Sequence, residues 1–164
     1  MAARVTPLSR LHNLKNFDCG DIELNKYLRE TARQHQRKYI SKTYILAHEH
    51  APADVIGFYT LAIRKMVPAQ AFPPGWAKGM PSQVPAFSLA RLAVHHTEKH
   101  RGYGTFLLFE AMQCAAVAAE RVGGYALFVD AKDAQVAAFY RKFGYVPFHE
   151  NPFILFMPFS DMPP

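Results

Sequence analysis

Basic side chains and two glycines stand between two apolar segments in the middle of the chain. Leu89–Val94 is long enough for one strand, the polar stretch His95–Arg101 follows it, and Gly102 and Gly104 precede a segment expected to be helical. The first backbone N–H groups of a helix lack intrahelical partners, and the helix dipole favours negative charge there. Glycine lets a ligand approach the backbone because it has no Cβ atom. The pattern therefore indicates a site for an anionic ligand.

The motif alone leaves the anion unidentified. A phosphate-binding loop would need a Lys-Ser or Lys-Thr pair after the second glycine, but Thr105 and Phe106 stand there. A dinucleotide fingerprint would need a third glycine and a later acidic residue. Lys99, His100 and Arg101 could add positive charge against phosphates. A strand, turn and helix in which the glycines serve only the geometry fits the same residues.

The charge of the whole chain also favours an anionic partner. The 164 residues include 19 Lys and Arg against 13 Asp and Glu, a formal net charge of +6. This charge favours nucleic acid, a phosphorylated cofactor or an acidic protein, although it could also be only a soluble basic surface. Length and apolar content predict a single globular domain over residues 1–164. We expect no bilayer-spanning run, no secretory signal and no disulfide framework. These expectations predict a cytoplasmic protein without a membrane partner.

A second basic feature lies nearer the N-terminus. Asp21 can cap a helix that runs to Tyr39, in which apolar residues recur at helical spacing. Its second half is strongly basic and includes Arg33, Arg37 and Lys38. These cations could contact nucleic acid phosphates, and the interleaved His35 and Tyr39 could stack on bases. A solvated helix face explains the same charges.

The other segments complete a mixed order of strands and helices. Strands at 42–49 and 55–63 are expected to form a hairpin, and a long loop rich in Pro and Gly follows at 68–86. A strand at 125–130 and a helix at 133–143 come after the central helix, with two short strands last. Strand–helix–strand units place successive strands side by side in parallel. The order predicts a mixed α+β fold.

Four blocks, in this order, carry a resemblance to a known family. They are LARLAV at 89–94, the K-x-x-G-x-G pattern that ends at Gly104, FVDAKD at 128–133 and AAFYRKFGY at 137–145. Together they resemble the GNAT superfamily of N-acetyltransferases, whose glycine motif binds acetyl-coenzyme A (acetyl-CoA). The resemblance implies a mostly antiparallel twisted sheet that is flanked by helices and splayed at the cofactor site.

Two further blocks resemble the acetyltransferase toxins of bacterial toxin–antitoxin pairs. Phe17–Gly20 matches their F-x-C-G motif, and Gly57–Thr60 matches their G-x-Y-T strand, in which the glycine suggests a bulge or a close backbone approach. This resemblance implies acetylation of the α-amine of aminoacyl-tRNA, which would block translation. It also implies two partners, a ribbon–helix–helix antitoxin and a second copy of the chain in a homodimer.

The resemblance assigns roles to individual residues. Tyr140 would be the general acid for the departing coenzyme A thiolate, although outside the family context it would be an ordinary core aromatic. A backbone N–H on the strand that ends at Val94 would face the developing oxyanion. The expected cofactor-binding residues are Leu92, Ala93, Val94, Lys99, His100, Arg101, Gly102, Tyr103, Gly104, Thr105, Phe139, Tyr140 and Phe143. The expected tRNA contacts are Arg91, Arg33, Arg37 and Lys38.

The sequence departs from the glycine motif of the family at one position, and it does not identify a general base. Lys99 stands where the family has Gln or Arg, and none of the strand-end carboxylates Glu49, Asp54 and Asp130 stands out as a general base. No metal site is expected, because the paired histidines are too closely spaced for the usual ligand arrangement. The alternatives are a free-standing acetyltransferase for a small amine or protein N-terminus, and a non-catalytic module that binds acetyl-CoA or nucleic acid.

Overall fold

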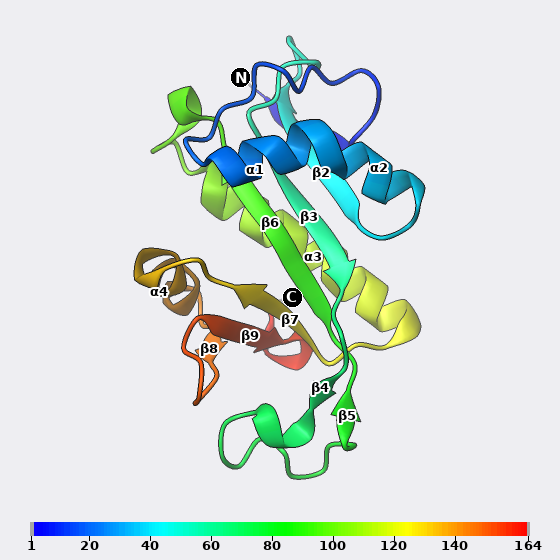
Figure 1. Cartoon of the computed structure of the whole chain (residues 1–164), viewed down its shortest axis with the longest axis vertical. Helices are drawn as coiled ribbons and strands as arrows, with labels where there is room; N and C mark the ends of the chain where they lie inside the picture. The colour runs from blue at the N-terminus through cyan, green and yellow to red at the C-terminus, as the bar shows by residue number, and fades with distance from the viewer. Residues whose placement is uncertain (1, 164) are drawn as a thin grey trace. The chain divides into compact units, whose positions relative to one another are not determined.

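The computed structural model describes residues 2–163 of the chain (Figure 1). The strands are β1 (Ala3–Pro7), β2 (Lys42–His48), β3 (Gly57–Ile63), β4 (Val67–Pro68), β5 (Gln83–Val84), β6 (Phe87–Val94), β7 (Ala126–Asp130), β8 (Val146–Pro147) and β9 (Ile154–Pro158). The helices are α1 (Ile22–Lys26), α2 (Ala32–Arg37), α3 (Tyr103–Val122) and α4 (Ala134–Lys142), and the π-helical turn η1 (Tyr27–Thr31) joins α1 to α2.

Seven strands form one mixed sheet in the order β1-β2-β3-β6-β7-β9-β8, and β4 pairs with β5 in a separate small sheet. The pairs β1–β2, β2–β3, β7–β9 and β8–β9 are antiparallel. The pair β6–β7 is parallel, with Phe87 opposite Leu127 and Ser88 opposite Phe128. The connection between them contains α3, which supplies the crossover that parallel strands need. The predicted α+β class and mostly antiparallel sheet flanked by helices are confirmed.

The chain forms two compact units. The first contains the chain up to Ala62 together with Ala90–Ala111, and the second contains Ile63–Leu89 and the chain from Met112 onward. No helix among residues 2–163 is both long and apolar enough to cross a membrane.

The core of the first unit lies between its strands and the helical segment 22–37. The Asp21 carboxylate caps this segment by accepting hydrogen bonds from the N–H groups of Glu23 and Leu24, as the sequence predicts. The segment buries apolar side chains that pack with residues of β2 and β3 and with the loop before α1. The buried cluster includes Leu8, Phe17, Tyr27, Leu28, Ala32, Ile45 and Phe58. Burial of this apolar surface is what holds the short helices in place.

The core of the second unit is aromatic. Phe72 lies edge-on to Phe128 at 5.9 Å and to Phe156 at 5.1 Å between ring centroids. Trp76, which like Phe72 lies in the long segment between β4 and β5, is edge-on to Phe156 at 5.1 Å. Edge-to-face aromatic pairs at these separations are favourable. They anchor the Pro- and Gly-rich segment, so Trp76 is part of the packing.

Gly57 in β3 occupies a position with no room for a side chain. A Cβ atom there would lie 2.7 Å from the carbonyl oxygen of Ala93 in β6 and 2.9 Å from Leu107 Cδ1 in α3. The glycine of the G-x-Y-T block therefore permits a close backbone approach, as its sequence context suggests.

Substitution of Gly57 by Ala is expected to lower the free energy of unfolding by about 1–3 kcal/mol, because the added methyl group meets a backbone oxygen that cannot turn aside. Urea denaturation followed by circular dichroism measures this change. Gly104→Ala is the matched control, because a Cβ atom at Gly104 meets no described heavy atom within 4 Å. Equal stability of the two variants would contradict the steric explanation.

Candidate active site

The segment predicted to bind an anion folds as a strand end, a turn and a helix N-terminus, all in the first unit. β6 ends at Val94, and α3 begins at Tyr103. Gly102 has a φ of +85° and His100 a φ of +66°, both in the left-handed region that favours glycine. A Cβ atom at Gly102 or Gly104 would meet no heavy atom of the described residues within 4 Å. The backbone of the turn is therefore sterically accessible to a ligand.

The three basic residues of the turn have different surroundings. Lys99 Nζ donates a 2.8 Å hydrogen bond to the carbonyl oxygen of Cys19. Arg101 Nη1 lies 3.5 Å from Glu98 Oε1. His100 is exposed. Lys99 was predicted to bind the cofactor, and the structure shows in addition that its side chain is hydrogen-bonded to the backbone at Cys19.

The F-x-C-G block forms a loop that is hydrogen-bonded to this turn. The Asp18 N–H donates to His95 Nδ1 at 3.0 Å, and the His96 N–H donates to the Asp18 carbonyl oxygen at 2.8 Å. With the Lys99 bond, three hydrogen bonds join residues 18–19 to residues 95–99. The loop thus supports the turn that precedes α3.

Asn25 in α1 fixes the shape of that loop from within. Its Oδ1 accepts a 2.9 Å hydrogen bond from the Cys19 N–H, and its Nδ2 donates to Asp18 Oδ1 at 3.0 Å. Asp18 Oδ1 also accepts from the Gly20 N–H at 2.9 Å. The bond from Gly20 and then the bond from Asn25 lower the pKa of Asp18, because both stabilise the charged carboxylate.

The candidate general acid, Tyr140, lies on α4 in the second unit. Asp133 caps this helix through a 2.9 Å hydrogen bond from the Val136 N–H. The Tyr140 ring is buried and edge-on to Phe139 at 5.2 Å, and Phe139 in turn contacts Phe143 at 5.2 Å. The three predicted aromatic residues therefore come together. Burial raises the pKa of Tyr140 well above its ordinary value, so the phenol stays protonated around neutral pH.

Tyr145 also belongs to this aromatic group, a contact that the sequence alone does not predict. Its ring lies 5.4 Å from the Tyr140 ring, and its buried hydroxyl has no hydrogen-bond partner among residues 2–163. Burial, and then the negative charge that Tyr140 would carry when ionised, raise the pKa of Tyr145. The block AAFYRKFGY already contains Tyr145, but nothing in its sequence signals the contact with Tyr140.

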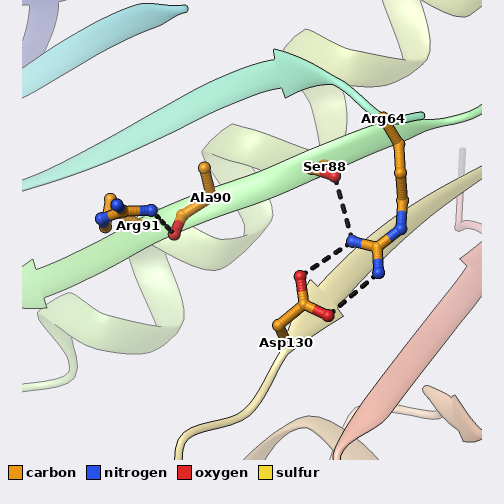
Figure 2. Close-up of polar contacts among 5 residues, drawn as sticks. All are labelled: Arg64, Ser88, Ala90, Arg91 and Asp130. Atoms are coloured by element: carbon orange, nitrogen blue, oxygen red, sulfur yellow. Dashed lines mark hydrogen bonds and ion pairs between the residues drawn. The ribbon is translucent and has the colours of Figure 1, made fainter.

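Asp130, one of the carboxylates considered as a general base, is held by Arg64 (Figure 2). Arg64 Nη1 and Nη2 each lie 2.9 Å from a different carboxylate oxygen, and Nη1 also donates to Ser88 Oγ at 3.1 Å. The guanidinium lies 4.7 Å from the centroid of the Phe128 ring. Because both oxygens of Asp130 accept from Arg64, the carboxylate is positioned as a structural partner at the end of β7. Nothing in the sequence around Arg64 predicts this ion pair.

The side chain of Arg91 makes contacts with other residues of the first unit. Its Nη1 donates to the carbonyl oxygen of Ala90 at 2.8 Å, as Figure 2 shows. Its guanidinium lies 4.4 Å from the centroid of the Tyr27 ring, within the range of a cation–π contact. These contacts hold the side chain of Arg91 against the helical segment.

The three remaining predicted tRNA contacts fall into two groups. Arg33 Nη2 donates to the carbonyl oxygens of Ser9 and His12 at 3.0 and 2.8 Å, so it ties the helix to the preceding loop. Arg37 and Lys38 are exposed at the end of α2. No group of three His, Cys, Asp or Glu side chains suited to a metal ion occurs in the described part of the chain.

Comparison with known proteins gives the family. The model of the acetyltransferase (GNAT) domain matches residues 40–147. The chain is 32% identical over 138 residues to a tRNA-acetylating toxin of Mycobacterium tuberculosis, an alignment that covers 84% of this chain and 81% of that protein.

Solved structures extend the similarity to nearly the whole chain. The structure of AtaT complexed with acetyl-methionyl-tRNAfMet has a TM-score of 0.89 and 29% identity, and covers 97% of this chain and 96% of that chain. A Tyr-to-Phe variant of AtaT bound to the C-terminus of the antitoxin AtaR and to acetyl-CoA has a TM-score of 0.81 and 27% identity, with coverage of 96% and 94%. The chain belongs to the GNAT family of acetyltransferases.

Proposed function

We propose that this protein transfers the acetyl group of acetyl-CoA to the α-amine of aminoacyl-tRNA and thereby acts as a toxin that blocks translation. The observation that carries the proposal is the similarity over 97% of the chain to AtaT in complex with an acetylated aminoacyl-tRNA. The net charge of +6 suits an RNA substrate. The exposed turn before α3 and the buried phenol of Tyr140 suit acetyl transfer.

We propose that acetyl-CoA uses the two sets of residues predicted from the sequence. Backbone N–H groups from Gly102 to Thr105 would bind the diphosphate at the start of α3, where the glycines keep the backbone accessible. The edge of β6 at 92–94 would pair with the amides of the pantetheine arm. Phe139 and Phe143 would exclude water from that arm.

The reaction forms a C–N bond and breaks the thioester C–S bond. The attacking amine must be neutral, and an α-amine with a pKa of about 7.7–8.0 is neutral in a useful fraction at neutral pH. A strong general base is therefore unnecessary. This agrees with the structure, in which Asp130, a carboxylate considered for that role, accepts hydrogen bonds from Arg64 on both oxygens. The nitrogen loses one proton during the reaction, and the sulfur of coenzyme A gains one.

Tyr140 would donate its hydroxyl hydrogen to the departing sulfur. A thiol, with a pKa of about 8.5, is a stronger acid than the buried phenol, whose pKa is raised. A proton given to sulfur must therefore be replaced, and the proton lost by the amine provides the replacement. Tyr140 then acts as a hydrogen-bond donor and proton relay that ends the cycle protonated.

Lys99 would influence acetyl-CoA binding through the loop that contains Cys19. Lys99→Met removes the 2.8 Å bond and is expected to raise the KM for acetyl-CoA several-fold with little change in kcat. Asn25→Ala, which disturbs the same loop from within, is expected to act similarly. The double variant should be little worse than the more affected single variant, because both substitutions disturb one structure.

Steady-state kinetics on the two single variants and the double variant test this coupling. Lys99→Arg, which can still donate a hydrogen bond, serves as the conservative control, and thermal unfolding reports any general loss of structure. Effects on KM that multiply independently would show that Lys99 acts separately from the loop, as a direct phosphate contact would.

We also propose the partners that the toxin resemblance implies. The chain would form a homodimer in the cytoplasm and be neutralised by a ribbon–helix–helix antitoxin. Support comes from AtaT, which is bound to the C-terminus of its antitoxin AtaR. The positive net charge of this chain would favour an acidic antitoxin segment.

Transfer of radiolabel from acetyl-CoA tests the proposed function. Charged tRNA should become labelled, and deacylated tRNA of the same sequence should not. If neither RNA is labelled while a small amine or peptide speeds coenzyme A release, the protein is a free-standing acetyltransferase of another specificity. Absence of any heat of binding with acetyl-CoA in calorimetry would instead favour a non-catalytic module that binds only nucleic acid or an acidic partner.

A further inference from the structure

An aromatic side chain stands in solvent at the end of the basic helix. Tyr39 follows α2 and is 96% exposed, and Ile40 beside it is 53% exposed. Arg37 and Lys38 before it and Lys42 after it are exposed as well. We call residues 37–42, from the last residue of α2 to the first residue of β2 (Figure 1), the basic tip.

The backbone holds Tyr39 in a conformation that disfavours an aromatic residue. Its φ is +60°, in the left-handed region. The Tyr39 N–H donates to the Gln36 carbonyl oxygen at 3.2 Å, and the Ile40 N–H donates to the His35 carbonyl oxygen at 2.9 Å. This is the hydrogen-bond pattern of a helix C-terminus at which glycine is the usual residue, because a Cβ atom is strained there. Stability of the fold alone therefore does not explain a tyrosine at this position.

Tyr27 in the same helical segment makes the contrast clear. It is only 9% exposed, its hydroxyl lies 3.1 Å from Ser41 Oγ, and its ring contacts His35 and the guanidinium of Arg91. Tyr27 thus contributes to packing within the first unit. Tyr39, in contrast, presents nearly its whole surface to solvent among three exposed cations.

We propose that the basic tip is an RNA-contacting surface on which the Tyr39 ring stacks against an unpaired base of the tRNA substrate. Arg37, Lys38 and Lys42 contact phosphates beside that base. A nucleobase flanked by phosphates is the partner whose chemistry matches an exposed ring surrounded by positive charge. The inference rests on the proposed function, because that function makes tRNA the substrate.

Replacement of Tyr39 by Gly separates the RNA contact from fold stability. Tyr39→Gly removes the ring and relieves the strained φ, so its melting temperature should equal or exceed that of the wild type. Its KM for aminoacyl-tRNA should rise by about tenfold, the size expected for one lost base–aromatic stack. Its KM for acetyl-CoA and its kcat should stay unchanged. Tyr39→Trp, which retains an aromatic face, should keep a KM for tRNA near the wild-type value.

Direct binding makes the test independent of catalysis. Fluorescence anisotropy with labelled, deacylated tRNA should show weaker binding for Tyr39→Gly, and Arg37→Gln should reduce the slope of log Kd against log salt by about one. Wild-type affinity of Tyr39→Gly for tRNA would overturn the inference, even if the wild-type enzyme acetylates aminoacyl-tRNA normally. If the wild type acetylates no tRNA, the proposed function fails, and weaker RNA binding by Tyr39→Gly would still support an RNA surface. Altered self-association or antitoxin binding with unchanged RNA affinity would assign the basic tip to a protein partner.

Discussion

Replacement of Tyr140 by Phe is expected to lower kcat for acetyl transfer to aminoacyl-tRNA by about a hundredfold or more. The substitution removes only the hydroxyl and leaves a ring that can still pack against Phe139 and Tyr145. The KM for acetyl-CoA should therefore change little. Single-turnover measurement of acetyl transfer, combined with calorimetry of acetyl-CoA binding, separates the two effects.

A matched tyrosine provides the control for this prediction. Tyr125 also lies in the second unit, where its ring contacts Phe72 at 5.8 Å, and it has no proposed catalytic role. Tyr125→Phe should retain wild-type kcat. Retention of single-turnover transfer by Tyr140→Phe would show that the Tyr140 hydroxyl is not needed for the reaction.

The pH profile tests the protonation state of Tyr140. Burial raises its pKa above the ordinary value of about 10, so the phenol keeps its proton throughout the neutral and mildly alkaline range. The rate should rise as the substrate amine loses its proton near pH 8 and should then stay level up to about pH 10. A fall in rate just above pH 8 would indicate a catalytic acid with a much lower pKa than Tyr140.

Removal of Asp130 is expected to destabilise the protein more than removal of Arg64. The Arg64 side chain is 17% exposed and Asp130 is 64% exposed. Asp130→Ala leaves a largely buried guanidinium without its carboxylate, at a cost of about 2–3 kcal/mol. Arg64→Met keeps an apolar chain near Phe128 and leaves a carboxylate that water can solvate, so its cost should be about 1 kcal/mol.

Urea denaturation of the two single variants and of the Arg64→Met/Asp130→Ala double variant measures these differences. The double variant should be about as stable as Arg64→Met, because no buried charge is left alone. Acetylation by Asp130→Ala should keep the wild-type pH profile, since Asp130 is not proposed to take a proton. Greater destabilisation by Arg64→Met, or loss of the alkaline plateau in Asp130→Ala, would contradict this role.

Short-range signals predicted much of the fold. The helix 133–143 could be predicted because Asp133 and Gly144 mark its ends, and the structure places α4 at Ala134–Lys142 with Asp133 as its cap. The helix from Asp21 was correctly located, but its π-helical turn at Tyr27–Thr31 was not anticipated. A local change of helical period is set by packing, which the spacing of apolar residues does not specify.

Long-range contacts are where the sequence was least informative. Lys99 was correctly placed in the turn before α3, yet its partner, the Cys19 carbonyl, lies 80 residues away. Arg64 was missed for the same reason, because its partner Asp130 is 66 residues away. Arg33 and Arg91 show a related limit, since residue type predicts a positive charge but not whether the guanidinium bonds to the protein itself.

Acetylation of the α-nitrogen is tested most directly by mass spectrometry of the amino acid carried by the tRNA. Charged tRNA is incubated with the protein and acetyl-CoA, and mild alkali then releases the aminoacyl group for analysis. The released amino acid should be heavier by one acetyl group, with the fragment pattern of an N-acetyl amino acid, and Tyr140→Phe should leave it unmodified over the same time. Release of only the unmodified amino acid by the wild-type protein would contradict acetyl transfer to aminoacyl-tRNA.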